Sequence, residues 1–121
     1  MTRLLASALL LGLTATAALA AEPINIRTNT AGELADACAT NPKDAGADAR
    51  INFCHGFAQG AITTQLRIAT DKKAFCFPSP APKRTETMNE FVRWVRADGS
   101  RAALNSAEGL FQFLGQRYPC K

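Results

Sequence analysis

The chain has 121 residues and a formal net charge of +4, with 14 Lys and Arg against 10 Asp and Glu. The two signs are interleaved along the chain, which favours a solvated mixed surface and argues against a nucleic-acid-binding patch. The length predicts one small domain, in which covalent staples matter because a small core buries a modest fraction of its surface.

The chain opens with the three parts of a secretory signal peptide. Arg3 supplies the positive start, residues 4–13 form an uncharged apolar stretch, and residues 18–20 (ALA) form a small-x-small cleavage site. We therefore predict that residues 1–20 are a signal peptide and that residues 21–121 form the mature periplasmic domain. A bilayer span needs about 20 strongly apolar residues, so we expect no membrane association after cleavage.

Two helices are predicted in the first half of the mature chain. Thr30 and Glu33 have the spacing of a capping box, so the first helix begins there, and it ends before Pro42. The second begins within residues 45–49 and runs to about Thr70, because apolar residues recur at intervals of three and four.

Two more helices are predicted in the second half. A second capping box, Thr87 with Glu90, opens the third helix, which stops at residues 98–100 (DGS), and the fourth takes residues 104–119. The positions expected in the core are Met88, Phe91, Val92, Val95, Leu110, Phe111, Leu114 and Tyr118. With no strand-like alternation, the predicted fold is all-α: a small four-helix bundle stapled by two disulfides.

An even count of four cysteines in a small exported chain indicates two disulfides. The spacings are wide and contain no C-x-x-C pair, which argues against a zinc site. In an up-down bundle Cys38 and Cys54 meet at one end, and Cys76 and Cys120 meet at the other. This geometry favours Cys38–Cys54 with Cys76–Cys120 among the three possible connectivities.

The only histidine, His55, directly follows Cys54. Neighbouring helical residues point about 100° apart around the axis, so the two side chains are poorly placed as a nucleophile and its base. The position four residues later is Gln59, so the helix offers no second metal ligand. We therefore expect no catalytic residue, no metal and no cofactor.

Gly56 and Gly60 lie one turn apart within the second predicted helix. Glycine inside a helix costs roughly 1 kcal/mol relative to alanine, so we expect the pair to permit close packing of a neighbouring helix. The alternatives are that two poor helix formers are merely tolerated, or that this face serves a homodimer.

Three motifs in chain order are moderately specific in combination: F-C-x-G-(aromatic)-x-x-G, then C-x-P, then (aromatic)-P-C. They are matched by Phe53, Cys54, Gly56, Phe57, Gly60, Cys76, Pro78, Tyr118, Pro119 and Cys120. In this pattern the chain resembles the Rap/Tai family of immunity proteins of the bacterial type VI secretion system, over about residues 30–120.

The resemblance implies a helical, often dimeric periplasmic inhibitor that neutralises a secreted peptidoglycan amidase by blocking its active-site cleft. The protein itself would perform no chemistry. The matched residues are scaffold residues, so the resemblance carries over no inhibitory residue. Two other classes stay open: a periplasmic holdase of the acid-stress type, which an excess of bases over acids disfavours, and an accessory domain of the cell envelope.

The segment of residues 77–84 is the candidate binding element, because its three prolines stiffen it and a rigid element loses less freedom on binding. Phe77 would be an apolar anchor, while Lys83 and Arg84 would attract an acidic partner. The alternative is an ordinary connection with Phe77 packed in the core.

Overall fold

The computed structural model describes residues 25–121, and in this range all regular structure is helical. The predicted signal peptide lies outside the described residues. The helices are α1 (Ala31–Cys38), α2 (Ala47–Ile68), α3 (Arg84–Arg96), α4 (Gly99–Ala102) and α5 (Ser106–Arg117). The all-α prediction is confirmed, and α1, α2, α3 and α5 correspond to the four predicted helices. None of the helices within residues 25–121 has both the length and the apolar character of a membrane span.

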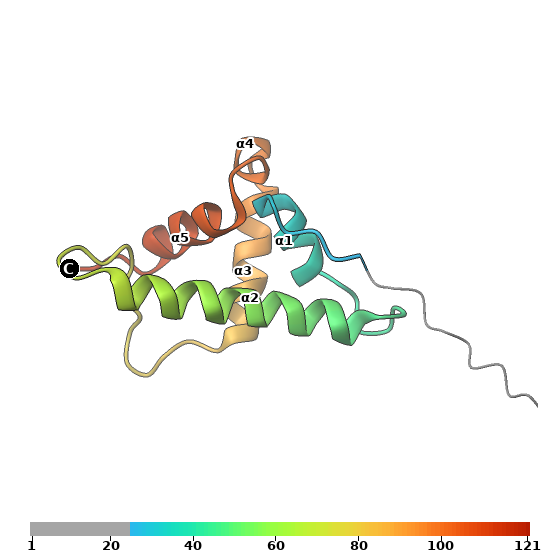
Figure 1. Ribbon diagram of the computed structural model, residues 1–121, viewed down its shortest axis with the longest axis horizontal. Coiled ribbons are helices and arrows are strands. Elements are labelled where there is room, and N and C mark those ends of the chain that lie inside the picture. Colours follow the sequence, from blue (N-terminus) through green and yellow to red (C-terminus); the bar gives the residue numbers. More distant parts are fainter. Residues whose placement is uncertain (1–24) are drawn as a thin grey trace, which may run out of the picture.

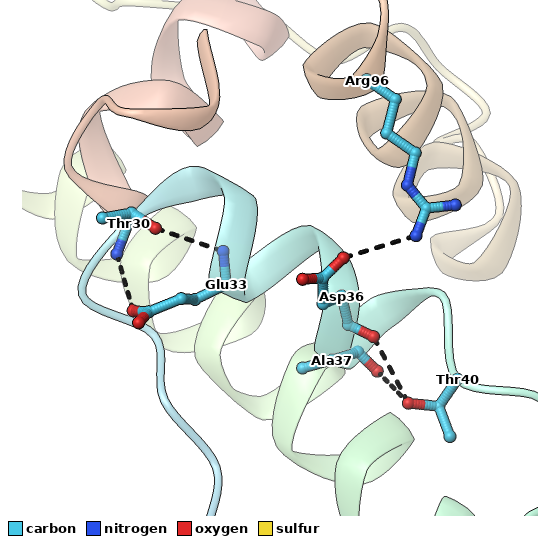
Figure 2. Close-up of polar contacts among 6 residues, drawn as sticks. All are labelled: Thr30, Glu33, Asp36, Ala37, Thr40 and Arg96. Atoms are coloured by element: carbon cyan, nitrogen blue, oxygen red, sulfur yellow. Dashed lines mark hydrogen bonds and ion pairs between the residues drawn. The ribbon is translucent and has the colours of Figure 1, made fainter. Parts of the chain in front are cut away.

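The short helix α1 is the hub of the bundle, since it contacts each of the other four helices. Figure 1 shows α1 beside the upright α3 and above the long horizontal α2. Its start is fixed by the predicted capping box, in which the Thr30 hydroxyl accepts from the Glu33 amide at 3.2 Å and the Glu33 carboxylate accepts from the Thr30 amide (Figure 2). Near its other end, Asp36 pairs with Arg96 of α3 (Figure 2).

The starts of α1 and α5 are held against each other by backbone hydrogen bonds. The Ala31 amide donates to the Leu104 carbonyl at 2.8 Å, and the Ser106 amide donates to the Asn29 carbonyl. A Cβ built on Gly109 would lie 2.7 Å from the Ala31 Cβ, closer than real Cβ atoms come. Gly109 is therefore the residue that lets α5 approach α1.

The expected close packing at Gly56 and Gly60 is wrong within this chain. A Cβ added at either glycine would meet nothing within 4 Å, because both face open space. The buried residues of α2 include Cys54 and Ala58, and Gly56 points about 200° around the axis from Cys54. The two glycines therefore lie on the outer face of a peripheral helix.

The predicted capping box at the start of the third helix is also wrong, because α3 begins at Arg84. Thr87 is buried inside the helix, where its hydroxyl donates to the Lys83 carbonyl at 3.1 Å and lies 3.3 Å from the Tyr118 hydroxyl. Glu90 instead forms an ion pair with Arg117 of α5 at 2.6 Å. Both side chains are thus engaged in tertiary contacts that local spacing does not reveal.

A further helical turn, α4, begins at Gly99, within the predicted stop at residues 98–100. Asp98 accepts a hydrogen bond from the Ser100 amide at 2.9 Å and caps α4, which the sequence analysis did not predict. Arg101 of this turn lies over the Trp94 ring, 4.4 Å from its centroid. The turn therefore packs back on α3.

The core is aromatic and aliphatic, and Phe75, Phe91, Leu34, Leu110 and Leu114 are its largest fully buried members. The predicted α3 face is confirmed, since Met88, Phe91, Val92 and Val95 are all buried. Two details differ in α5: Phe113 is buried, while Phe111, which was expected in the core, is half-buried at its edge. Phe75 reaches the core from the irregular segment after α2.

Both predicted disulfides are present, and no cysteine is free. Cys38–Cys54 ties the end of α1 to α2, while Cys76–Cys120 ties the segment after α2 to the C-terminus. Figure 1 shows the C-terminus beside that segment. The second bridge is reinforced where the Cys76 amide donates to the Tyr118 carbonyl at 2.8 Å.

Candidate partner-binding groove

A groove of about 480 Å³ separates the C-terminal half of α2 from the start of α3, and we call it the α2–α3 groove. Figure 1 shows that the segment between α2 and α3 bows away from the bundle before it enters α3. The groove is lined by Ala58, Gln59, Ile62, Thr63, Leu66, Phe77, Ala81, Pro82, Arg84, Thr87 and Met88.

The floor of the groove is apolar because α2 and α3 contribute aliphatic and thioether side chains to it. Ile62 and Leu66 lie one turn apart on α2, and Met88 faces them from α3. Leu66 is 39% exposed, although its spacing predicts a core position. This face therefore has apolar side chains in an incompletely covered position, as binding grooves do.

Phe77 forms one wall of the groove rather than a projecting anchor. Its ring packs against Phe75, with centroids 5.4 Å apart, and against Tyr118, with centroids 5.2 Å apart. It is half-buried, and its remaining surface lines the groove. Phe77 is therefore a core contact on one side and a groove contact on the other, and its role as an anchor for a partner stays a prediction.

Arg84 is the only charged residue among those that line the groove. Its guanidinium donates to the neutral Gln59 side-chain oxygen at 2.9 Å. None of the ion pairs formed within residues 25–121 includes Arg84. A cationic group with free donors thus stands at the rim of an apolar floor.

Lys83 does not line the groove, although it is adjacent to Arg84 in sequence. Its ammonium lies 3.5 Å from Glu86, and its side chain is 83% exposed. The structure therefore brings two of the three predicted contact residues, Phe77 and Arg84, to the groove. Sequence reasoning missed Ile62, Leu66 and Met88 as groove residues, because their spacing also fits a helix face that is fully covered.

The lining of the groove contains no cysteine, histidine or carboxylate side chain. Cys54 is bound in a disulfide, so it is not a nucleophile. In the described part of the chain, no three His, Cys, Asp or Glu side chains cluster as metal ligands. What the groove offers is shape, apolar surface and one positive charge, which are the elements of recognition.

The carboxyl groups with shifted pKa values do not line the groove. The hydrogen bond from Arg117 lowers the pKa of the Glu90 carboxyl, and hydrogen bonds from Ser100 lower the pKa of Asp98. The first is an inter-helix ion pair and the second a helix cap, so both shifts reflect structural contacts.

The family model described as Rap1a immunity proteins matches residues 30–120 of this chain. The matched range contains all five helices, both disulfides and every residue of the groove. No curated protein and no solved structure matches the chain.

Proposed function

The chain belongs to the family of Rap1a immunity proteins, and from this membership we propose that it binds a secreted toxin protein and neutralises it. The match over residues 30–120 is the observation that carries the proposal, because it spans nearly the whole described domain. The role is one of recognition without chemistry, in keeping with an apolar groove that has no catalytic group.

The proposed toxin is a peptidoglycan amidase delivered by a type VI secretion system. The three motifs through which the chain resembles the Rap/Tai family support this choice. The proposed compartment is the periplasm, where the amidase would reach its cell-wall substrate. Two disulfides suit that oxidising compartment, and residues 1–20 have the pattern of a signal peptide.

The proposed contact surface is the segment of residues 77–84 together with the α2–α3 groove, and contact there would close the amidase active site. Phe77 supplies an apolar wall, while Lys83 and Arg84 supply positive charge. The segment is held at one end by the Cys76–Cys120 bridge and at the other by α3, so little ordering is needed on binding.

The direct test is protection of cells. A candidate peptidoglycan amidase, sought first among the genes next to this one, is exported to the periplasm of a laboratory host, with or without the full chain. We expect lysis without the chain and growth with it. A matched variant that lacks residues 1–20 stays in the cytoplasm and should fail to protect. Lysis in the presence of the exported full chain would contradict the proposal.

A further inference from the structure

We propose that the α2–α3 groove recognises a partner segment that carries a large apolar side chain with an aspartate or glutamate close beside it. The apolar side chain would occupy the floor of Ile62, Leu66 and Met88, and the carboxylate would bind Arg84. The inference rests on the proposed function, since it names the chemistry by which this surface would hold its protein partner.

The floor argues for an apolar occupant. Seven of the eleven lining residues have apolar side chains, and only Gln59, Arg84 and the two threonines carry polar side-chain groups. Thr87 already bonds within the protein, to the Lys83 carbonyl and the Tyr118 hydroxyl. Thr63 is likewise engaged, because it accepts from Gln59 at 3.2 Å. Thr63 is also exposed, so its own O–H stays in contact with water when an apolar side chain occupies the floor.

Arg84 argues for an acidic neighbour to that side chain. Its single hydrogen bond goes to a neutral amide oxygen, which leaves most donors of the guanidinium fork unused. A carboxylate would accept two parallel hydrogen bonds from that fork, and such charge-assisted pairs are stronger than neutral ones. The groove lining contains no acidic residue, so nothing within it competes with or repels an incoming carboxylate.

The charges around Arg84 limit the preference for an acidic residue to the part of the partner segment that faces Arg84. Lys83 next to it is paired with Glu86, so its charge is partly satisfied by its own chain. A segment with lysine or arginine beside its apolar residue would meet Arg84 with like charge, and a neutral segment would gain only a neutral hydrogen bond. The groove therefore discriminates by charge as well as by apolar fit.

The experiment uses the oxidised protein purified from the periplasm of an expressing host. A phage-displayed library of random twelve-residue peptides is the probe. Selection is run on the wild-type chain, with counter-selection on Leu66→Asp, which places a negative charge on the floor. Leu66 is 39% exposed, so this variant should fold. A synthetic peptide from the enriched set is then titrated by calorimetry.

We expect the enriched peptides to combine Leu, Ile, Met or Phe with Asp or Glu within four residues. Arg84→Gln should lower the affinity about tenfold, as expected for one charge-assisted hydrogen-bonded pair. Replacing the peptide's Asp or Glu by Asn or Gln should lower the affinity by the same factor. Combining this replacement with Arg84→Gln should lower the affinity little further, because either change alone already removes the pair. The matched variant Arg50→Gln removes an exposed arginine at the start of α2, outside the groove, and should leave affinity unchanged.

Failure to enrich any peptide, enrichment without an acidic residue, or an affinity that Arg84→Gln leaves unchanged would overturn the inference. Each of these results would leave the immunity role standing if the full chain still protects cells from the amidase. Peptides that bind as expected to a chain that does not protect would instead refute the amidase as the partner while retaining the groove's chemistry.

Discussion

The ring of Phe77 packs against the ring of Tyr118, with centroids 5.2 Å apart, directly beside the Cys76–Cys120 disulfide. One wall of the α2–α3 groove is thereby fixed to the end of α5. The backbone hydrogen bond from Cys76 to Tyr118 adds to the same junction. The shape of the groove consequently depends on the second disulfide more than on the first.

The double variant Cys76→Ser/Cys120→Ser should lose more stability than Cys38→Ser/Cys54→Ser. The sequence separations are 44 and 16 residues, and the loop-entropy model gives about 4 and about 3 kcal/mol of unfolding free energy for the two bridges. Urea unfolding followed by circular dichroism measures both. A larger loss from the Cys38–Cys54 pair would show that native strain or residual structure, not loop length, sets the order.

The Tyr118 hydroxyl should contribute modestly to stability. Tyr118→Phe removes the contact with the buried Thr87 hydroxyl but keeps the ring, and Thr87 still bonds the Lys83 carbonyl. We expect a loss of about 1 kcal/mol in unfolding free energy, against about 3–5 kcal/mol for Tyr118→Ala, which also empties the space beside Phe77. Similar losses from the two variants would mean that the ring contributes little packing.

Glycine substitutions should have opposite effects at two kinds of position. Gly109→Ala places a Cβ against Ala31, so we expect overpacking that costs roughly 1–3 kcal/mol. Gly56→Ala and Gly60→Ala meet open space inside a helix, so each should stabilise the fold by up to about 1 kcal/mol. Thermal unfolding of the three variants is the measurement. A destabilised Gly56→Ala or Gly60→Ala variant would reveal a neighbour on that face, such as a second copy of the chain.

The sequence predicted the parts of this fold that depend on local periodicity. The capping box at Thr30 and the buried face of α3 are confirmed, and each follows from spacing along one helix. Both disulfides are confirmed as well, and their pairing follows from the up-down order of the helices. The starts of helices were less predictable where a side chain has a distant partner. Thr87 and Glu90 have the spacing of a capping box, yet Tyr118 and Arg117 engage them instead.

Only part of the candidate groove was predictable from the sequence, namely the wall that the segment of residues 77–84 supplies. The prolines and charges of residues 77–84 led to the prediction of a binding element there. Of its three predicted contact residues, Phe77 and Arg84 line the groove and Lys83 does not. The floor was not predictable, because Leu66 has the spacing of a core residue and only the path of the chain leaves it uncovered. For the same reason the glycines of α2 gave a false signal: spacing shows that they share a face but not what that face meets.

Acid should weaken the contact between α3 and α5. The hydrogen bond from Arg117 lowers the pKa of Glu90 below its ordinary value of 4.5, so the unfolded chain binds that proton at a higher pH than the folded chain. The stabilisation is therefore present above about pH 4.5 and is lost as the pH falls through the folded-state pKa. Glu90→Gln should lower the melting temperature at pH 7 and show a smaller further drop on acidification.

The matched control for this pH effect is Glu108→Gln. Glu108 lies on α5 and accepts from Gln112 of the same helix, so the variant removes a carboxylate without breaking an inter-helix ion pair. It should keep the acid sensitivity of the wild-type chain. Parallel melting curves for Glu90→Gln and the wild-type chain across the acidic range would contradict the role of this pair.

The most direct measurement of the central claim is inhibition of the candidate peptidoglycan amidase by the purified chain. Peptidoglycan hydrolysis is followed as the oxidised protein is added in increasing ratio to the enzyme. We predict complete inhibition near equimolar ratio by the wild-type chain and by Arg50→Ala, and weaker inhibition by the folded double variant Lys83→Ala/Arg84→Ala. Undiminished hydrolysis in an excess of the wild-type chain would contradict the account.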